Sequence, residues 1–299
     1  MQLLYSIDAT NDTLAFKNPI STLDKNLEKT RELFVFLIGN ILAVAQYAEK
    51  DSRHRAAKNV PSEADLNVNT KISGNQIAWQ IKENATYQSA IEQYKTHLCI
   101  DDDITRKLYL LLAQSTEYKQ YIDLQSRERR LDIEILSYLF NSIMLQSDLF
   151  VSSAEDRFAN WDDDAEMLQT IINTYLGRPQ NIAMDNMVDA DKWHFAKTLL
   201  NTCLEKKAHL LELITPKLKN WDADRIASID MILLQMGISE LLYFETIPTK
   251  VTINEYIDLA KEYSTEQSGQ FINGLLDNLH KEFLENGKIN KIAFKKIPR

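Results

Sequence analysis

Residues 222–285 read DADRIASIDMILLQMGISELLYFETIPTKVTINEYIDLAKEYSTEQSGQFINGLLDNLHKEFLE. Apolar residues recur there at three- and four-residue spacing, which predicts helices over 222–246, 252–263 and 267–285. Thr252 and Glu255 have the spacing of a capping box, so we expect the middle helix to begin at Thr252. Gly274 lies inside an apolar helix, where glycine costs about 1 kcal/mol relative to alanine, and this predicts a close backbone approach or a binding role.

The composition of the whole chain indicates the same structural class. Its 299 residues include only 7 Gly and 6 Pro, below the usual shares of roughly 7% and 5%. Neither residue occurs between Gly74 and Gly177, where strands and hairpins would need turns. We therefore predict an all-α fold, a helical bundle with a large additional helical region. The length allows one large or two ordinary domains.

The segments before residue 190 are predicted to be a series of helices. Met1–Asp8 is apolar from its first residue and has no N-cap, as in a helix whose beginning is missing. A long amphipathic helix is expected over 21–58, a loop over 59–75 and a linker over 180–189. Three aspartates at 101–103 precede an apolar run, which is typical of a helix N-terminus. A further helix is expected over 191–214.

Cysteine use and apolar patterning bear on the compartment. Cys99 and Cys203 lie far apart in periodic apolar segments, so neither a disulfide framework nor a metal-binding cysteine pair is indicated. The longest apolar run, 33–45, is too short to span a bilayer. The first residues lack the pattern of a signal peptide. We expect a cytoplasmic protein.

The net charge of −9 is unevenly distributed. Residues 1–185 contain 19 basic and 27 acidic side chains (−8), whereas 186–299 contain 15 and 16 (−1). A nucleic-acid partner would therefore need a local basic surface. The clusters at 53–58 and 127–130 are read as solvated helix faces in preference to RNA contacts. The lysine-rich end, 288–299, is equally consistent with phosphate contact and with solubilisation.

No sequence motif indicates catalysis. A glycine-rich phosphate loop, a nucleophile elbow and a metalloprotease helix are all missing from the sequence. Asp191 with His194, and Asp277 with His280, have a spacing that two metal ligands could use, but such pairs arise often by chance in an acidic helical chain. We expect no catalytic residue, no metal and no cofactor.

The C-terminal region carries an ordered series of residues. It contains Trp221-x3-Arg225-x4-Asp230-x-Ile232-Leu233, Glu240-Leu241-Leu242, Ile247-Pro248-x-Lys250-Val251-x-Ile253-Asn254-Glu255, Ala260-Lys261 and Ser268-x2-Phe271-Ile272-Asn273-Gly274-Leu275-Leu276-Asp277. This series resembles the C-terminal half of the NusB transcription antitermination family, in the long version found in Bacteroidetes-type bacteria. The resemblance divides the chain into a remnant of the first helix (1–10), a helical insertion of unknown role (11–185), a NusB-like helical domain (186–285) and a basic tail (286–299).

The resemblance implies a transcription regulator that pairs with the ribosomal protein NusE. Such a factor binds the boxA RNA of nascent ribosomal RNA transcripts in the elongation complex with RNA polymerase. The implied RNA-binding residues are Tyr5, Thr265, Glu266, Gln267, Ser268, Gln270 and Phe271. Phe271 is also a candidate for partner contact, and we add Asp224 and Asp230 because a ribosomal partner should be basic.

Two departures from the family pattern affect the expected RNA binding. The arginine-rich start of the first helix is missing, and Gln267 stands where an acidic residue is common. We expect that the chain begins at an internal Met; the other interpretation is weakened RNA binding. A helical interaction scaffold that has lost RNA binding is therefore the alternative function. An RNA methyltransferase is disfavoured, because no nucleotide-binding βα unit follows residue 285.

Overall fold

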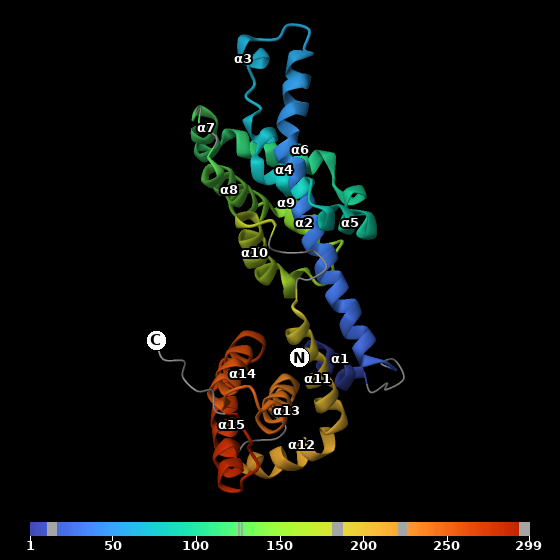
Figure 1. Cartoon of the computed structure of the whole chain (residues 1–299), viewed down its shortest axis with the longest axis vertical. Coiled ribbons are helices and arrows are strands. Elements are labelled where there is room, and N and C mark those ends of the chain that lie inside the picture. Colours follow the sequence, from blue (N-terminus) through green and yellow to red (C-terminus); the bar gives the residue numbers. More distant parts are fainter. Residues whose placement is uncertain (11–16, 125, 127, 181–187, 221–225, 293–299) are drawn as a thin grey trace. The chain divides into compact units, whose positions relative to one another are not determined.

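The structure is a computed structural model that describes residues 1–10, 17–124, 126, 128–180, 188–220 and 226–292. Every regular element in these ranges is a helix, which confirms the predicted all-α class (Figure 1). The chain divides into two compact units: unit 1 is Met1–Asp24 with Asp189–Arg299, and unit 2 is Lys25–Val188. Unit 2 begins 14 residues later and ends 3 residues later than the predicted insertion, 11–185.

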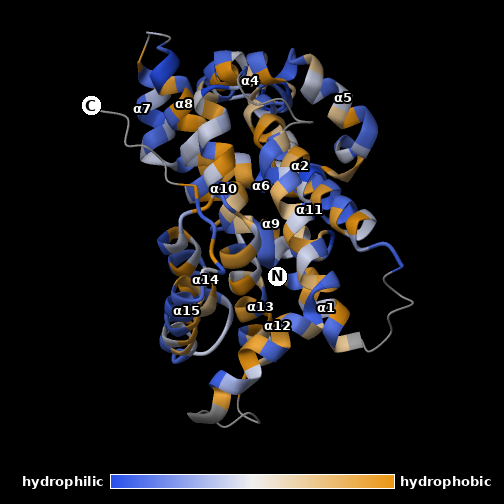
Figure 2. Ribbon diagram, turned by 60° about the horizontal axis from the view of Figure 1, so that its bottom comes forward, coloured by the Kyte–Doolittle hydropathy of each residue, from blue (hydrophilic) through white to orange (hydrophobic). Residues whose placement is uncertain are grey.

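Unit 1 is built around one buried helix, α13. Its elements are α1 (Gln2–Thr10), the start of α2 (Pro19–Ala56), α11 (Ala190–Glu205), α12 (Lys207–Ile214), η5 (Thr215–Asn220), α13 (Ser228–Tyr243), α14 (Thr249–Tyr263) and α15 (Ser268–Glu285). Residues 232–241 of α13 are buried throughout, and the helix is mostly orange in Figure 2. It lies between α1 on one side and the α14–α15 pair on the other, so α13 is the core of the unit.

Helices in unit 1 pack tightly at Gly237. A Cβ atom there would lie 3.1 Å from the side chain of Leu276 and 3.2 Å from the ring of Tyr256. At Gly274, where we predicted a close approach, a Cβ atom would meet no atom of the described chain within 4 Å. The prediction of close packing at Gly274 is therefore wrong, and the close approach that needs a glycine lies at Gly237 of α13.

The capping box predicted at Thr252 is also wrong. Helix α14 begins at Thr249, one turn earlier, with Pro248 as its N-cap. Thr252 is fully buried, and its hydroxyl donates a hydrogen bond of 2.7 Å to Oε1 of Glu240. The hydroxyl of Tyr256 donates to the other carboxylate oxygen at 3.1 Å. Burial, with the Glu240 carboxylate beside it, raises the pKa of Tyr256 well above its usual value.

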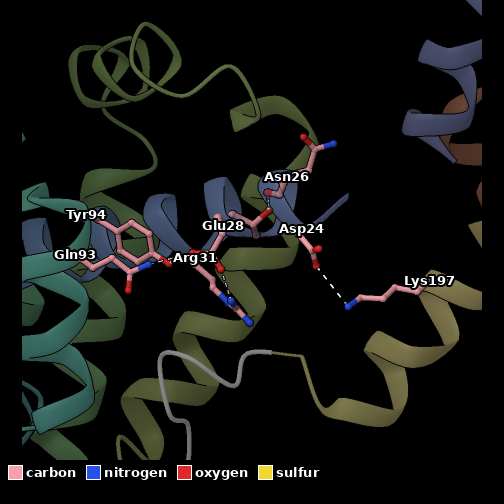
Figure 3. Close-up of polar contacts among 8 residues, drawn as sticks. Asp24, Asn26, Glu28, Arg31, Gln93, Tyr94 and Lys197 are labelled. Carbon is pink, nitrogen blue, oxygen red and sulfur yellow. Dashed lines mark hydrogen bonds and ion pairs between the residues drawn. The ribbon is translucent and has the colours of Figure 1, made fainter. Parts of the chain in front are cut away.

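Two polar contacts tie the outer parts of unit 1 to its core. Lys197 of α11 lies 3.6 Å from Asp24, at the start of α2 (Figure 3). After α15, the ammonium of Lys291 donates to the carbonyl oxygens of Glu240 (2.9 Å) and Phe244 (2.7 Å). These carbonyls lie at the end of α13, so Lys291 caps that helix with a positive charge.

Unit 2 is built around the remainder of α2. Its other elements are α3 (Glu63–Leu66), η1 (Lys71–Gly74), α4 (Gln76–Lys82), α5 (Ala85–Tyr94), η2 (Thr96–Cys99), α6 (Asp102–Gln114), α7 (Thr116–Asp123), α8 (Arg129–Tyr138), the π-helical turn η3 (Leu139–Met144), α9 (Asp148–Glu155) and α10 (Trp161–Gly177). From Leu33 to Ala48 nearly every side chain of α2 is buried. This helix is apolar enough to cross a membrane, yet 78% of its apolar window is buried within the structure. Here it is a core helix.

Local polar contacts in unit 2 fix the start of α6 and join α2 to α5. The Asp101 carboxylate accepts from the amides of Asp103 (2.8 Å) and Ile104 (3.0 Å), which confirms the predicted helix start. Glu28 of α2 accepts a hydrogen bond of 2.6 Å from the hydroxyl of Tyr94 (Figure 3), and this bond lowers the pKa of Glu28.

The predicted loop, 59–75, contains the short helices α3 and η1. In unit 1, the helix predicted over 191–214 is interrupted at Lys206.

Candidate RNA and partner interface

The turn between α14 and α15 carries most of the predicted site residues. Helix α14 ends at Tyr263, and Ser264 leaves the helical region with φ −129° and ψ −149°. Helix α15 starts four residues later at Ser268. The side chains of Thr265, Glu266, Gln267 and Gln270 are exposed. They present one hydroxyl, one carboxylate and two amides to a ligand.

The hydroxyl of Ser268 holds this turn in place. It donates to Oδ2 of Asp230 at 2.8 Å and accepts from the backbone amide of Thr265 at 3.2 Å. The hydroxyls of Thr265 (2.8 Å) and Ser264 (3.0 Å) lie within hydrogen-bond distance of the same oxygen. A serine hydroxyl has one proton, which Ser268 donates to the carboxylate of Asp230. The lone pairs of the Ser268 oxygen can therefore accept hydrogen bonds from the turn. Four residues from three elements are therefore joined at one atom.

Asp230 lies in the interior and not on the surface where we expected it. It is 4% exposed, and the oxygen that does not bind Ser268 has no hydrogen-bond partner within the described residues. We expected a partner contact because an exposed carboxylate would face a basic protein, and the burial of Asp230 removes that reason. Its position instead makes it a residue that orients the turn through Ser268.

Ser268 and Phe271 are likewise buried. Ser268 is 2% exposed and Phe271 is 4% exposed, and the ring of Phe271 belongs to the apolar core of unit 1. The amide of Phe271 donates to the carbonyl of Gln267 at 3.1 Å, which closes the first turn of α15. In this structure both side chains support the turn from beneath, while the four exposed side chains are the accessible part.

Tyr5 is the predicted stacking residue of α1. Its ring is 43% exposed, while the adjacent Leu3 and Leu4 pack into the core. Lys207 of α12 forms an ion pair of 2.6 Å with Asp8, which fixes the end of α1. Helix α1 packs against α13, and α13 separates it from the α14–α15 pair. The structure thus brings the turn residues together and places Tyr5 on a different helix.

Comparison with known proteins identifies the chain. A model described as the NusB family matches residues 156–281. The chain is 39% identical over 113 residues to the transcription antitermination protein NusB of Methylacidiphilum infernorum, which is 34% of this chain and 78% of that protein. The chain belongs to the NusB family. Its relatives are proteins of transcription antitermination.

Further NusB proteins match the same part of the chain. The NusB of Salinibacter ruber is 41% identical over 97 residues, 32% of this chain and 61% of that protein. The NusB of Listeria monocytogenes is 35% identical over 100 residues, 33% of this chain and 78% of that protein. A solved structure of T. maritima NusB is 30% identical and covers 36% of this chain and 82% of that one, with a TM-score of 0.30. These matches leave most of this long NusB-family chain uncovered.

Asp224 and Lys261 are two further positions of interest in the NusB-like part of the chain. Asp224, predicted as a partner contact, lies outside the described residues. Lys261, which was not predicted, runs beside the start of α15: its Cγ would lie 3.1 Å from a Cβ at Gly269. Its ammonium pairs with Asp258 at 2.9 Å. The Ala260-Lys261 pair belongs to the series quoted above, but nothing in the local sequence places Lys261 next to Gly269.

Proposed function

We propose that the chain is a cytoplasmic antitermination factor that binds boxA-type RNA in nascent ribosomal RNA transcripts and pairs with the ribosomal protein NusE. The supporting observation is the α14–α15 turn, where exposed polar side chains are fixed from beneath by the Ser268–Asp230 hydrogen bond of 2.8 Å. A rigid turn lowers the entropy lost on binding, which favours recognition of a specific RNA. Membership of the NusB family gives the proposal its ligand.

The proposed RNA contacts are of two kinds. The amides of Gln267 and Gln270 and the hydroxyl of Thr265 bond to the edges of unpaired bases, as single-stranded RNA recognition requires. The exposed ring of Tyr5 supplies stacking, which is worth about 1–3 kcal/mol per base. The carboxylate of Glu266 is exposed beside these groups, and it repels the phosphates of an RNA that binds in another register. Ser268, Phe271 and Asp230 hold these groups in position.

The proposed partner surface adjoins the α14–α15 turn at Phe271. NusE contacts the residues around Phe271, and Asp224, which lies outside the described residues, is the second proposed contact. RNA and NusE are bound together in the elongation complex with RNA polymerase. The protein performs no reaction in this proposal.

One observation favours the alternative, an interaction scaffold that has lost RNA binding. The exposed turn residues include one carboxylate and no cation, and nearby Lys261 is paired with Asp258. Phosphate contacts supply a large share of RNA affinity and of its salt dependence. On the scaffold alternative, NusE binds and RNA does not.

The test measures both ligands with the full chain. Fluorescence anisotropy of labelled boxA RNA is recorded with the chain alone and with purified NusE, for the unaltered protein and for a variant carrying Thr265→Ala and Gln270→Ala. We expect this variant to bind RNA about tenfold more weakly or worse, since each lost hydrogen bond is worth about 0.5–1.5 kcal/mol. NusE binding is expected to weaken less than RNA binding, because the proposed partner residues Phe271 and Asp224 are retained.

Asn278→Ala is the matched control, because Asn278 is an exposed amide farther along α15. It is expected to bind RNA as the unaltered protein does. Retention of NusE binding with no RNA binding by the unaltered chain would favour the scaffold. Failure to bind either ligand would contradict the proposal.

A further inference from the structure

Unit 2 contains an open groove that the NusB-like unit does not explain. Its main lobe, about 490 Å³, lies among α2, η1, α4 and α6, and includes Arg53, Trp79 and Lys82. A second lobe of about 240 Å³ continues it toward α5 and η2. The two lobes share the lining residues Ala43, Gln46 and Lys82 and are therefore adjacent, and we call them together the groove. The helices that contribute to it are α2, α4, α5 and α6 (Figure 1).

Trp79 is an exposed aromatic platform in the main lobe. It is 46% exposed, although Ala78 and Ile81 on the same short helix are buried. Its indole N–H donates to the carbonyl of Ser73 at 3.0 Å, which fixes the orientation of the ring. The ammonium of Lys82 lies 5.2 Å from the ring centroid. A fixed, accessible tryptophan next to a cation is suited to stacking a nucleobase.

The cations of the main lobe are available to an anionic ligand. Arg53 and Lys82 are exposed, and neither forms an ion pair within the described ranges; Nε of Arg53 donates to the carbonyl of Glu49 at 3.3 Å, and Lys82 lies over the Trp79 ring. Lys50 is held by Asp102 at 2.8 Å. Asp102 and Glu49 are the carboxylates that line the lobe.

The neighbouring cations of the same helix end are engaged elsewhere. Arg55 pairs with Asp51, and Lys58 pairs with Asp65, both within 2.8 Å. Of the basic cluster at 53–58, the structure therefore directs Arg53 into the groove and occupies the two others. This distinction could not be drawn from the sequence.

The second lobe is lined by both apolar and polar residues. Leu42, Ile91 and Ile100 line it, together with Gly39, where a Cβ would lie 3.4 Å from Ile100. Gln46 and His97 add hydrogen-bonding groups. A lobe with apolar side chains and a few polar groups, adjacent to a lobe that contains Arg53 and Lys82, matches the alternation of bases and phosphates in single-stranded nucleic acid.

We propose that this groove is a second RNA-binding site, in which one base stacks on Trp79, a neighbouring base enters the second lobe, and Arg53 and Lys82 each contact a phosphate of the bound strand. The proposal rests on the proposed function in taking a transcript as the ligand. It differs in assigning RNA contact to unit 2 and not to the α14–α15 turn of unit 1. Because stacking and phosphate contacts read no base edge, the site is expected to accept many sequences.

The experiment uses the full chain and a fluorescein-labelled 12-nucleotide oligo(U), with anisotropy measured from 50 to 200 mM salt. Two groove variants are compared with the unaltered protein: Trp79→Ala, and Arg53→Gln combined with Lys82→Gln. We expect each to bind at least fivefold more weakly. The double variant should also show a salt slope that is shallower by about 1.4, since each phosphate contact to a single strand contributes about 0.7.

The matched control is Arg106→Gln combined with Lys107→Gln, which removes two exposed cations of α6 that do not line the groove. It should change affinity less than twofold. Circular dichroism and thermal melting verify that each variant is folded. A Trp79→Phe variant keeps a smaller stacking surface and is expected to fall between Trp79→Ala and the unaltered protein.

Three results would overturn the proposal. The first is no binding of oligo(U) by the unaltered chain, and the second is unchanged binding by both groove variants. The third is complete competition by free UMP at a concentration equal to that of oligo(U), because it would indicate a nucleotide pocket. The Thr265→Ala/Gln270→Ala variant separates this proposal from the proposed function. Loss of oligo(U) binding in that variant alone, with the groove variants unchanged, would reject the second site and leave the first.

Discussion

The hydroxyl of Ser268 lies 2.8 Å from Oδ2 of Asp230, and this bond joins the start of α13 to the turn that opens α15. Both residues are almost fully buried. Since Ser268 also accepts from the turn, the carboxylate of Asp230 determines where the exposed side chains of Thr265 and Gln270 stand. The bond is thus the point at which the core of the bundle fixes the proposed interface.

Replacing Ser268 by Ala is expected to destabilise the protein by about 1–3 kcal/mol, because a buried carboxylate loses its hydrogen-bond donor. Urea unfolding followed by circular dichroism measures this loss. The same variant should bind boxA RNA more weakly even at temperatures where it is fully folded. Ser268→Thr keeps the hydroxyl and should recover part of the affinity. Unchanged stability in Ser268→Ala would show that the bond does not hold the turn.

Gly237 of α13 and Gly274 of α15 should respond in opposite directions to alanine. Gly237→Ala introduces a methyl group about 3.1 Å from Leu276, and overpacking of this kind typically costs about 1–3 kcal/mol. Gly274→Ala meets no atom of the described chain and gains helix propensity, so it should stabilise by up to about 1 kcal/mol. Thermal melting of the two single variants decides the point. A destabilised Gly274→Ala would contradict the open surface seen at that position.

Buried tyrosines should make the protein sensitive to alkali. Burial raises the pKa of Tyr87, Tyr118 and Tyr175 in unit 2, and that of Tyr256 in unit 1. A native pKa above the unfolded value of about 10 means that this stabilisation is complete below pH 10 and is lost as pH rises toward the native values. Phenolate absorbance should therefore show fewer than the 12 tyrosines titrating near pH 10 in the native chain, and all 12 in urea. Equal titration in both states would refute the expectation.

Replacing Asn75 should reduce the stability of unit 2 more than replacing the N-cap residue Asn84. Its side-chain oxygen accepts from the amides of Ile77 (2.9 Å) and Ala78 (3.1 Å), and its amide donates to the carbonyl of Asp132 at 2.9 Å. Asn75→Ala is expected to lose about 1–3 kcal/mol, because buried partners are left unsatisfied. Asn84→Ala removes a half-buried cap of α5 and should lose about 1 kcal/mol. Urea unfolding measures both losses. An equal loss of unfolding free energy in the two variants would contradict the larger contribution expected from the buried hydrogen bonds of Asn75.

The helical class and most helices of the C-terminal bundle could be predicted from the sequence, because their apolar spacing is local. The deep burial of 33–48 on every side could not, since it depends on helices distant in the chain. Thr252 shows the limit of a local motif. Its spacing to Glu255 fits a capping box, but a carboxylate on another helix, that of Glu240, is the partner of its hydroxyl.

The candidate site was predictable to a similar extent. The resemblance indicated the turn 265–271, and the structure shows which of its side chains are exposed. The resemblance could not indicate that Asp230 and Ser268 are buried together, because the two residues are 38 positions apart in the sequence. The groove around Trp79 was missed for the same reason: Arg53 lies on a different helix from Trp79 and Lys82, and their common orientation exists only in the folded chain.

The most direct test of the central claim is the affinity of the full chain, in complex with NusE, for boxA RNA and for a scrambled RNA of the same length and composition at a fixed salt concentration. The proposed function predicts that the complex binds boxA RNA at least tenfold more tightly, and that Thr265→Ala with Gln270→Ala removes the preference. Equal affinity for the two RNAs would contradict it.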